Sequence, residues 1–524
     1  MYIKRSSFNG VDSRLHLNFK SATSSNLYTV LLGENGSGKS ELIKETINNL
    51  LRVKAAYIEG DYDRGKFSYS DSLDKYLSNK YKENSPDFNI ASGVEIYLDN
   101  TNVVTFEFTK LNSERMIKNR NGENVLVSDG EFRYTYNLKK NNLEDCDVIE
   151  KVKQFTIISI SESSHIKFPI VQDGEKLNYY YPGKLQENSV ERYFNYNEKK
   201  EVSFKEKTIL LSILESTLEG NNAKINEVFS LLGFDFCLDV KVSLSQSMIN
   251  NTKDLEHYFS TQNNFSSDGI SEISKSKIEL LKIAIEWYKK NTEIKVNNVF
   301  SNSISDISRT FKLDLISQKE VIKNLFVLIS SNIVSVSKVK FIKKNQPIEI
   351  SQISSGQICL ISSFSSIAAK IENNSVIFID EPEISLHPSW SSKYISLLTS
   401  IFSEYKGCHF IIATHSPHII SSLPDKDFVL VMNDGNKPIL LESKDFNFRS
   451  IDFQMAKAFG FPGDRNEYLI RIIMVIIGKV SESEKLSCED YDNIKYLNEI
   501  HPKISSNDPV FHLINQINKL VPNG

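Results

Sequence analysis

The sequence predicts an α/β fold whose central sheet is built from both ends of the chain, with a mainly helical insertion and a helical C-terminal tail. An apolar run, a glycine-rich loop and a helical pattern follow one another between residues 28 and 51. Further apolar runs of strand length lie between residues 338 and 432. Between these two parts, much of residues 203–331 carries hydrophobic residues at helical spacing.

Composition limits the class of protein. The chain has 524 residues, with 62 Lys and Arg against 66 Asp and Glu, and a formal net charge of −4. With 40% hydrophobic residues it can bury a core, which excludes a wholly disordered or collagen-like chain. Its five cysteines are scattered, so neither a disulfide framework nor a zinc site is predicted. We expect a cytoplasmic protein, because the N-terminus lacks an apolar signal segment and no apolar stretch is long enough to span a bilayer.

Residues 1–165 are expected to form an N-terminal lobe of the core. Tyr28–Leu32 is a continuous apolar run, which is typical of a buried strand. Val94–Leu98 and Val103–Phe108 alternate between apolar and polar residues and predict an antiparallel β subdomain. Phe155–Ile160 predicts the last strand of this lobe.

Residues 166–345 are expected to form the helical insertion. Ser203-Phe-Lys-Glu206 has capping-box spacing, and Gly220 can end the helix that follows. Ser317-Gln-Lys-Glu320 has the same spacing and predicts the start of another helix. Residues 250–276 are rich in Ser, Asn and Asp and predict a mobile loop.

Residues 346–435 are expected to form the C-terminal lobe of the core, and residues 436–524 the helical tail. Val376–Ile379, His409–Ala413 and Phe428–Met432 are apolar runs of strand length. From Ile451 onward the hydrophobic residues have helical spacing.

The glycine-rich loop has the spacing of a phosphate-binding loop. Gly33-Glu-Asn-Gly36-Ser-Gly38-Lys39-Ser40 matches Gly-x4-Gly-Lys-Ser, whose backbone N–H groups surround a phosphate at the positive end of the next helix. Lys39 would reach the β- and γ-phosphates, and the Ser40 hydroxyl would be a ligand of Mg²⁺. A chance match is the alternative, but the strand before the loop and the helix after it favour a nucleotide site.

Two carboxylates follow another apolar strand. Asp380 and Glu381 come directly after Val376–Ile379, and in open α/β sheets ligands bind at the carboxyl ends of the strands. Asp380 can hold hydrated Mg²⁺, and Glu381 can orient and polarise an attacking water. The alternative is an acidic pair that is simply solvated. The phosphate-binding loop in the same chain favours a role in nucleotide binding instead.

Two more motifs are those expected if a triphosphate is bound from two sides. Ile353-Ser-Ser-Gly-Gln357 precedes an apolar helix, and its hydroxyl and amide groups can bind an anion at the helix N-terminus. Taken alone it is an ordinary serine N-cap. His415, in Ala413-Thr-His-Ser-Pro417, follows the next strand, where an imidazole can contact the γ-phosphate.

Together these motifs resemble the ABC-type ATPase superfamily that includes SMC proteins, RecF, RecN and the OLD ATPases. The resemblance implies that Gly33–Ser40 is the Walker A loop, Ile353–Gln357 the signature, Asp380 with Glu381 the Walker B pair and His415 the switch histidine. It also implies a head-to-head homodimer with ATP between the Walker A loop of one subunit and the signature of the other, with Ser355 and Gly356 acting in trans. Hydrolysis would then need a dimer.

The site residues implied by this resemblance fall into three groups. Catalysis is expected from Glu381 and His415, and Mg²⁺ binding from Ser40 and Asp380. ATP contacts are expected from Gly33, Asn35, Gly36, Ser37, Gly38, Lys39, Ser40, Glu41, Ser354, Ser355, Gly356 and Gln357.

Two features depart from the transporter members of the superfamily. A glutamine after the strand Phe155–Ile160 is not evident, so that role is left unassigned. Asp380-Glu-Pro-Glu-Ile-Ser-Leu-His-Pro388 is similar to the form found in OLD-like and bacterial defence ATPases. His387, within this motif, is expected either to touch the dimer partner or to pack within its own subunit.

The short insertion and the motif Phe459-Gly-Phe-Pro-Gly-Asp-Arg-Asn-Glu467 resemble the Septu-type defence ATPases of the PtuA family, including their retron-associated relatives. That resemblance implies anti-phage defence with an HNH nuclease partner (PtuB-like) and, in retron versions, a reverse transcriptase and its msDNA. Nucleic acid is then expected at the level of the complex. No nuclease motif is evident, and Asp490-Tyr-Asp492 is interpreted as a solvated acidic turn.

Two rival functions remain open at this point. One is a DNA repair or recombination ATPase of RecF, RecN or OLD type, which would bind DNA in an ATP-dependent way without a nuclease partner. The other is a stand-alone effector whose helical tail is itself a nuclease, which would cleave DNA or tRNA without a partner.

Overall fold

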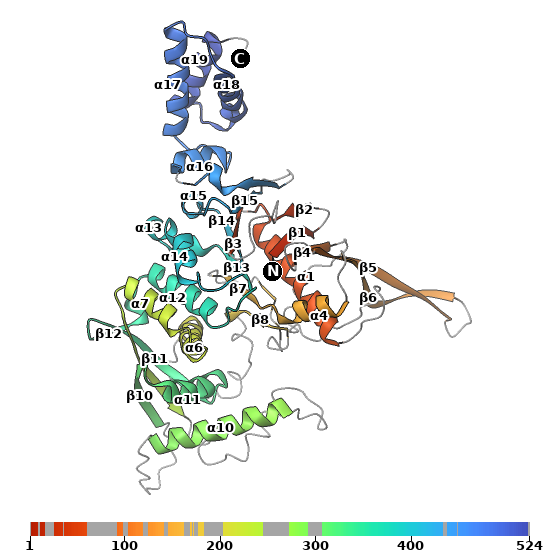
Figure 1. Ribbon diagram of the computed structural model, residues 1–524, viewed down its shortest axis with the longest axis vertical. Coiled ribbons are helices and arrows are strands. Elements are labelled where there is room, and N and C mark those ends of the chain that lie inside the picture. The colour runs from red at the N-terminus through yellow and green to blue at the C-terminus, as the bar shows by residue number, and fades with distance from the viewer. Residues whose placement is uncertain are drawn as a thin grey trace. The chain divides into compact units, whose positions relative to one another are not determined.

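The computed structural model describes residues 2–8, 11–15, 26–34, 36–59, 92–97, 103–118, 124–140, 145–161, 168–169, 171, 177–182, 203–244, 272–291, 307–432, 438–447 and 449–521. The chain divides into two compact units. Unit 1 combines Met1–Tyr179 with Glu372–Gly524, and unit 2 is formed by Tyr180–Ile371. Both ends of the chain therefore fold into one unit, and Figure 1 labels many of the elements.

The centre of unit 1 is a seven-stranded sheet of order β16-β15-β3-β14-β13-β7-β8. Neighbours from β15 to β7 pair in parallel, whereas β16 is antiparallel to β15. The strands are β3 (Leu27–Leu32), β7 (Ile157–Ser161), β8 (Tyr179–Tyr180), β13 (Val376–Asp380), β14 (His409–Thr414), β15 (Phe428–Val431) and β16 (Ile439–Glu442).

Strand β3 lies between two strands from the C-terminal part of the chain. Leu32, its last residue, is paired with Thr414 of β14 and with Val431 of β15. All of β3, β13 and β14 is buried, and Tyr28 stacks on Phe410 with ring centroids 4.8 Å apart. The strands expected at these positions are confirmed, because strands buried on both faces are continuous apolar runs.

A five-stranded antiparallel sheet of order β2-β1-β4-β5-β6 confirms the expected antiparallel subdomain. Its strands are β1 (Tyr2–Phe8), β2 (Val11–Arg14), β4 (Ser92–Tyr97), β5 (Val103–Lys118) and β6 (Asn124–Lys140). The buried imidazole of His409 joins the two sheets. Its Nδ1 accepts from the Ile3 backbone at 3.1 Å, and its Nε2 lies 2.9 Å from Thr29 Oγ1. Since the Thr29 hydroxyl donates to Leu15 O, Nε2 must carry the ring proton.

The helices of unit 1 that precede the tail pack around these sheets. They are α1 (Lys39–Glu59) and α4 (Asp145–Gln154), with the short helices α13 (Pro388–Ser391), α14 (Tyr394–Ile401) and α15 (Pro417–Ile420) between later strands. Buried Lys54 of α1 donates to the carbonyls of Val152 at 3.0 Å and Lys153 at 3.2 Å, in the last turn of α4. Burial lowers the pKa of Lys54 to about 7.

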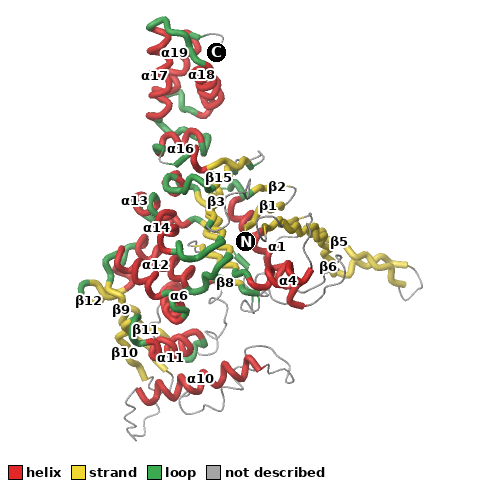
Figure 2. Tube along the Cα trace, viewed as in Figure 1, coloured by secondary structure: helices red, strands yellow, loops and turns green. Residues whose placement is uncertain are grey.

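Unit 2 combines helices with a four-stranded antiparallel sheet of order β10-β9-β11-β12, as Figure 2 shows by colour. The strands are β9 (Asp235–Leu244), β10 (Ile307–Asp314), β11 (Val334–Lys343) and β12 (Gln346–Glu349). The helices are α6 (Phe204–Leu218), α7 (Asn222–Leu231), α10 (Glu272–Asn291), α11 (Lys319–Ser330) and α12 (Ser355–Ala368).

The expectation of a mainly helical insertion is therefore wrong at two places. In β9 alternate residues are buried from Phe236 to Val242, because helices pack against this antiparallel sheet, α7 in contact with β9 and α6 and α11 in contact with β11. Strand β10 continues the same sheet. Residues 250–271 of the predicted loop lie outside the described residues, and α10 begins at Glu272, before the predicted end of that loop.

One of the two predicted capping boxes is present. Glu206 N donates to Ser203 Oγ at 3.3 Å, Ser203 N donates to Glu206 Oε2 at 3.0 Å, and Gly220 follows the helix at φ 85°. Helix α11 is instead capped at Gln318 without a side-chain hydrogen bond. Ser317 lies one residue before this N-cap, and its hydroxyl donates to Asp314 Oδ2 in the preceding turn.

The tail begins later than expected, because β16 belongs to the central sheet. Its helices are α16 (Ile451–Lys457), α17 (Glu467–Ser481), α18 (Cys488–Ile500) and α19 (Pro509–Leu520). Helices α17, α18 and α19 share a core that includes Ile473, Leu497 and Ile514. Asp490 is buried in the first turn of α18 and accepts from Lys479 at 2.8 Å, so the prediction of a solvated acidic turn is wrong.

The unit boundaries differ from the expected boundaries at residues 165 and 345. The chain passes between units after residues 179 and 371, so the motif Ile353–Gln357 belongs to unit 2. Helix α12, which this motif begins, packs against α6 and α7 of the same unit. Among the helices that the structure describes, none combines the length and apolarity needed to cross a bilayer.

Asp427, just before β15, makes a testable contribution to stability. It is fully buried and accepts from the Tyr28 backbone at 3.0 Å. Burial raises its pKa from 3.8 to about 8, so the folded state keeps a proton that the unfolded chain releases. This contribution is fully present below pH 3.8 and is lost as the pH rises towards 8.

We expect Asp427→Asn to remove up to about 1.4 kcal/mol per pH unit from the slope of unfolding free energy against pH between pH 5 and 7. Urea unfolding at several pH values measures this slope. Asp425→Asn, at an exposed position two residues earlier, is the matched control and should leave the slope unchanged. An Asp427→Asn protein with the wild-type slope would contradict the assignment.

Candidate active site

The loop between β3 and α1 has the backbone that a phosphate-binding loop needs. Gly36 and Gly38 have φ values of 88° and 85°, in the left-handed region that glycine adopts without steric cost. A Cβ on Gly33 would lie 2.3 Å from the carbonyl oxygen of Met432, directly after β15. Asn35 lies outside the described residues. Gly36 and Gly38 are thus needed for their backbone conformation, and Gly33 is needed because a side chain has no space there.

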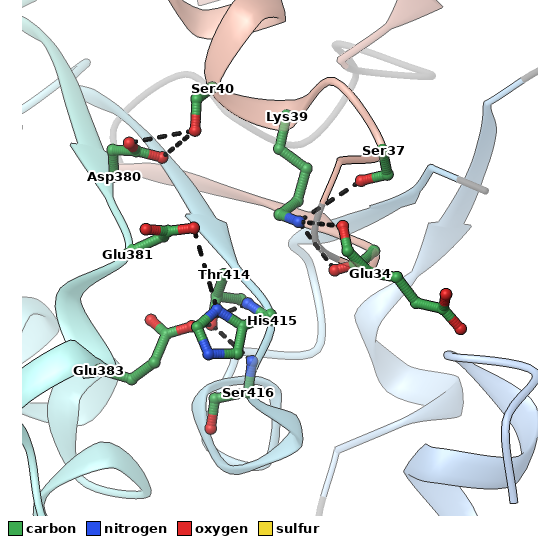
Figure 3. A network of polar contacts seen from close by, with 11 residues as sticks. Glu34, Ser37, Lys39, Ser40, Asp380, Glu381, Glu383, Thr414, His415 and Ser416 are labelled. Carbon is green, nitrogen blue, oxygen red and sulfur yellow. Dashed lines mark hydrogen bonds and ion pairs between the residues drawn. The ribbon is translucent and has the colours of Figure 1, made fainter. Parts of the chain in front are cut away.

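Lys39 turns back into this loop. Its side chain is almost fully buried, and Nζ donates to Gly33 O and Glu34 O, each at 2.8 Å, and to Ser37 Oγ at 3.4 Å. The ammonium group is therefore held by the loop that would surround the phosphates (Figure 3). Phosphate oxygens can replace these neutral acceptors, and charge-assisted hydrogen bonds are the stronger ones.

Ser40, at the start of α1, is hydrogen bonded to Asp380, at the end of β13. The Ser40 hydroxyl donates to Asp380 Oδ1 at 2.9 Å and lies 3.1 Å from Oδ2, although 340 positions separate the residues in sequence. Asp380 is fully buried at the end of β13. A hydroxyl and a carboxylate are the hard oxygen ligands that Mg²⁺ prefers, so the pair fits that ion.

Glu41, in the first turn of α1, lies 3.7 Å from Lys44 and has an exposed side chain. Among the described residues, no cluster of three His, Cys, Asp or Glu side chains is arranged to hold a metal. A divalent ion at Ser40 and Asp380 would therefore take its other ligands from phosphate and water, which is how Mg²⁺ is usually bound with nucleotides.

Glu381 has a strained backbone. Its φ of 50° and ψ of 56° are left-handed, which costs a residue other than glycine about 1–2 kcal/mol. Its N–H donates to Ala413 O at 2.9 Å, and Pro382 begins the short helix η3 (Pro382–Ser385). This turn leaves Asp380 in the strand while the Glu381 carboxylate points towards His415, with Oε1 4.0 Å from Nδ1.

A second carboxylate reaches the same imidazole. Glu383 Oε1 lies 3.2 Å from His415 Nδ1, and it accepts from His415 N at 2.7 Å and Thr414 Oγ1 at 2.6 Å. The His415 ring lies between Glu381 and Glu383 in Figure 3. Glu383 and Thr414 were not among the predicted site residues. The available signal was their position, since each stands in a motif that was already assigned to the site.

The signature residues lie in unit 2. Gln357 N donates to Ser354 Oγ at 3.3 Å, which makes Ser354 the N-cap of α12. Ser355 and Gly356 form the first turn of that helix, and Gln357 Nε2 donates to Leu232 O at 3.3 Å. The contact of Ser354, Ser355, Gly356 and Gln357 with ATP remains a prediction.

His387 caps a helix of its own subunit. Its Nδ1 lies 2.9 Å from Ser389 Oγ and accepts from Ser389 N at 3.3 Å, at the start of α13. Of the two roles expected for His387, packing within its own subunit is the one with an observed contact.

A cavity of about 380 Å³ adjoins the site. It is lined by Glu34 of the glycine-rich loop, by His415, and by Met455, Phe459 and Phe461 from α16 and the segment after it. The site therefore borders the tail as well as the sheet.

The fold and the site together define a P-loop α/β ATPase whose nucleotide-binding core is formed by the N- and C-terminal parts of the chain. Residues 12–420 match the family described as AAA ATPase domain, and the chain belongs to that family. The protein is an ATP hydrolase.

The chain is similar to the retron Ec83 probable ATPase of Escherichia coli, at 26% identity over 102 residues. That match covers 17% of this chain and 18% of the relative, so it spans less than a fifth of the relative's length.

The chain is also similar to solved SMC head domains. The head domain from Thermotoga maritima aligns over 84% of this chain and 99% of its own, with 13% identity and a TM-score of 0.32. The head domain with an extended coiled coil derived from Pyrococcus furiosus, bound to the C-terminal domain of ScpA, aligns over 85% and 97%, with 12% identity and a TM-score of 0.31.

Gly33→Ala tests the close approach at the loop. The added methyl group would lie 2.3 Å from Met432 O and 2.6 Å from Ser37 Oγ, so the loop must move away from β15. We expect a stability loss of about 1–3 kcal/mol and at least a tenfold loss of ATP affinity. Thermal unfolding and titration with a fluorescent ATP analogue measure the two effects.

The control is Gly478→Ala, in α17, where an added Cβ has no atom within 4 Å. It should leave ATP affinity unchanged and raise helix stability by up to about 1 kcal/mol. Wild-type ATP affinity in Gly33→Ala would show that the glycine is not required.

Proposed function

We propose that this ATPase is Mg²⁺-dependent, forms a homodimer on binding ATP, and controls a partner HNH nuclease in bacterial defence against phage. The observation that carries the chemistry is the hydrogen bond between Ser40 and Asp380, which joins the glycine-rich loop to the acidic strand end. Glu381 and His415 lie beside it in the same unit.

Each residue has a role in the proposed hydrolysis. The loop N–H groups and Lys39 bind the β- and γ-phosphates, and Ser40 with Asp380 would hold Mg²⁺, which would neutralise phosphate charge when bound. Glu381 accepts a hydrogen bond from the attacking water and thereby orients it. The water oxygen bonds to the γ-phosphorus as the bond to the β–γ bridging oxygen breaks, and the displaced proton passes to solvent. His415 contacts the γ-phosphate.

The proposed dimer completes the site. Ser355 and Gly356, at the N-terminus of α12, would reach the γ-phosphate held by a second copy of the chain, because helix N-termini favour anions. Ser354 and Gln357 would support this contact from the same turn.

The defence role rests on sequence similarity. The local match to a retron ATPase and the Asp-Glu-Pro-Glu form of the acidic motif both support it. In a retron version, a reverse transcriptase and its msDNA would join the complex, which would act in the cytoplasm. The test is whether the chain co-purifies with a nuclease encoded beside its gene. DNA or tRNA cleavage by the purified chain alone would favour a stand-alone effector instead.

Glu381→Gln should abolish ATP turnover while ATP is still bound, because the amide no longer polarises water but keeps the shape of the side chain. We expect kcat to fall at least a hundredfold, and the ATP-bound dimer to persist longer in size-exclusion chromatography. Glu372→Gln is the matched control, since Glu372 is a carboxylate of unit 1 that accepts from Thr156 Oγ1 at 3.3 Å. Unchanged hydrolysis in Glu381→Gln would contradict the role.

Shared sites can be tested by mixing two inactive variants. Ser355→Arg should block the signature, and Lys39→Ala should disable the phosphate loop, so each homodimer is inactive. A mixed dimer keeps one site with a wild-type loop and a wild-type signature, so mixing should restore up to about one quarter of wild-type activity in an equimolar mixture. Mixed dimers that form but stay inactive would argue against a shared site.

A further inference from the structure

Glu383 stands out because its carboxylate is buried although no role has been assigned to it. Its side chain is 6% exposed, and it lies in η3, directly after the strained turn at Glu381. Its Oε1 receives two hydrogen bonds, from the Thr414 hydroxyl and from the His415 backbone. Among the described residues, no donor reaches its Oε2. Burying a carboxylate costs free energy unless hydrogen bonds or a charged partner compensate for the lost water. The third group beside this carboxylate therefore bears on why it is buried.

The third contact is with the imidazole of His415. Nδ1 lies 3.2 Å from Glu383 Oε1, and an ionised carboxylate can only accept hydrogen bonds. Nδ1 must therefore carry a proton when the two groups are hydrogen bonded. In that state Nε2 is the ring nitrogen that remains for another partner. The side chain of His415 is 41% exposed, so part of the ring is accessible.

The network also fixes the backbone that carries the ring. Thr414 is fully buried at the end of β14, and its hydroxyl both donates to Glu383 and accepts from Ser416 N at 3.0 Å. Glu383 thus accepts a hydrogen bond from the His415 backbone N–H, and the same oxygen lies 3.2 Å from Nδ1 of the ring. A carboxylate placed beside both the backbone and the ring nitrogen is the arrangement by which a second residue orients a functional histidine.

We propose that Glu383 is the positioning residue for His415: its buried carboxylate keeps Nδ1 protonated and turned inward, so that Nε2 faces the γ-phosphate. This inference rests on the proposed function, in which His415 contacts that phosphate. Glu381 approaches the same Nδ1 only to 4.0 Å, so its carboxylate remains suited to the attacking water. The two glutamates of the Asp-Glu-Pro-Glu motif therefore have separate tasks.

A purely structural role is the alternative. Glu383 could serve only to join η3 to the end of β14, through Thr414 and the backbone N–H of His415. Glu383→Gln separates the two roles, because Gln keeps an oxygen that accepts both of these hydrogen bonds but loses the negative charge that favours a proton on Nδ1.

The test is a double-mutant cycle in the full-length chain. Glu383→Gln should lower kcat by about 10–100-fold with little change in KM for ATP, as loss of an orienting partner typically does. In a His415→Ala background, the same Glu383→Gln substitution should cause no further loss. Glu372→Gln again serves as the control and should be neutral in both backgrounds.

A second measurement follows the ring itself. In ¹⁵N-histidine spectra, the His415 signal, assigned by its absence in His415→Ala, should show a protonated Nδ1 in the wild-type protein. In Glu383→Gln it should shift towards the tautomer protonated on Nε2. If Glu383→Gln proves too unstable to purify, Glu383→Asp keeps the charge but draws it back from Nδ1, and the same fall in kcat is expected.

The outcomes distinguish the role of His415 from the positioning role of Glu383. Full activity in His415→Ala would overturn the proposed role of His415 and this inference with it. If His415→Ala is impaired but Glu383→Gln retains wild-type kcat, or if the losses from the two substitutions simply multiply, only the positioning role of Glu383 is overturned.

Discussion

The parallel pairing of β3 with β14 and β15 determines where the chemistry of this protein takes place. Parallel strands point their carboxyl ends to the same sheet edge, so the loop after β3 and the residues after β13 and β14 lie close together. The hydrogen bond between Ser40 and Asp380 is a direct result of this order. Without that pairing, the glycine-rich loop and the acidic motif would be unrelated segments of the chain.

Negative charge is concentrated at this edge. Asp380, Glu381 and Glu383 fall within four positions of one another, and each is oriented differently by the short left-handed turn at Glu381. The Ser40 hydroxyl faces the first carboxylate, and His415 faces the other two. A site built in this way accommodates a cation together with a phosphate more readily than an anion alone, because like charges at short range repel one another.

The parts that could be predicted from sequence are those with a local signal. Buried parallel strands such as β3 and β14 are continuous apolar runs, and the glycine-rich loop and the cap at Ser203 depend on residues a few positions apart. Strand β9 was missed although Phe236, Leu238, Val240 and Val242 alternate with less buried residues, which is the pattern of a half-buried strand. It lies among segments with helical spacing, and the helical interpretation was extended across it. The contacts of Glu383 could not be predicted, because Thr414 and His415 lie 31 and 32 positions away. The contact of Ser317 with Asp314, rather than with its own helix, was equally hidden from spacing alone.

The position of β3 also has a consequence for synthesis on the ribosome. Both of its sheet neighbours, β14 and β15, are translated only after the whole of unit 2 has been made. Strand β3 and the loop after it are therefore without both partner strands until residue 431 has left the exit tunnel. A nascent chain has no completed pocket for a nucleotide, and an apolar β3 exposed for that time is a natural client for chaperones.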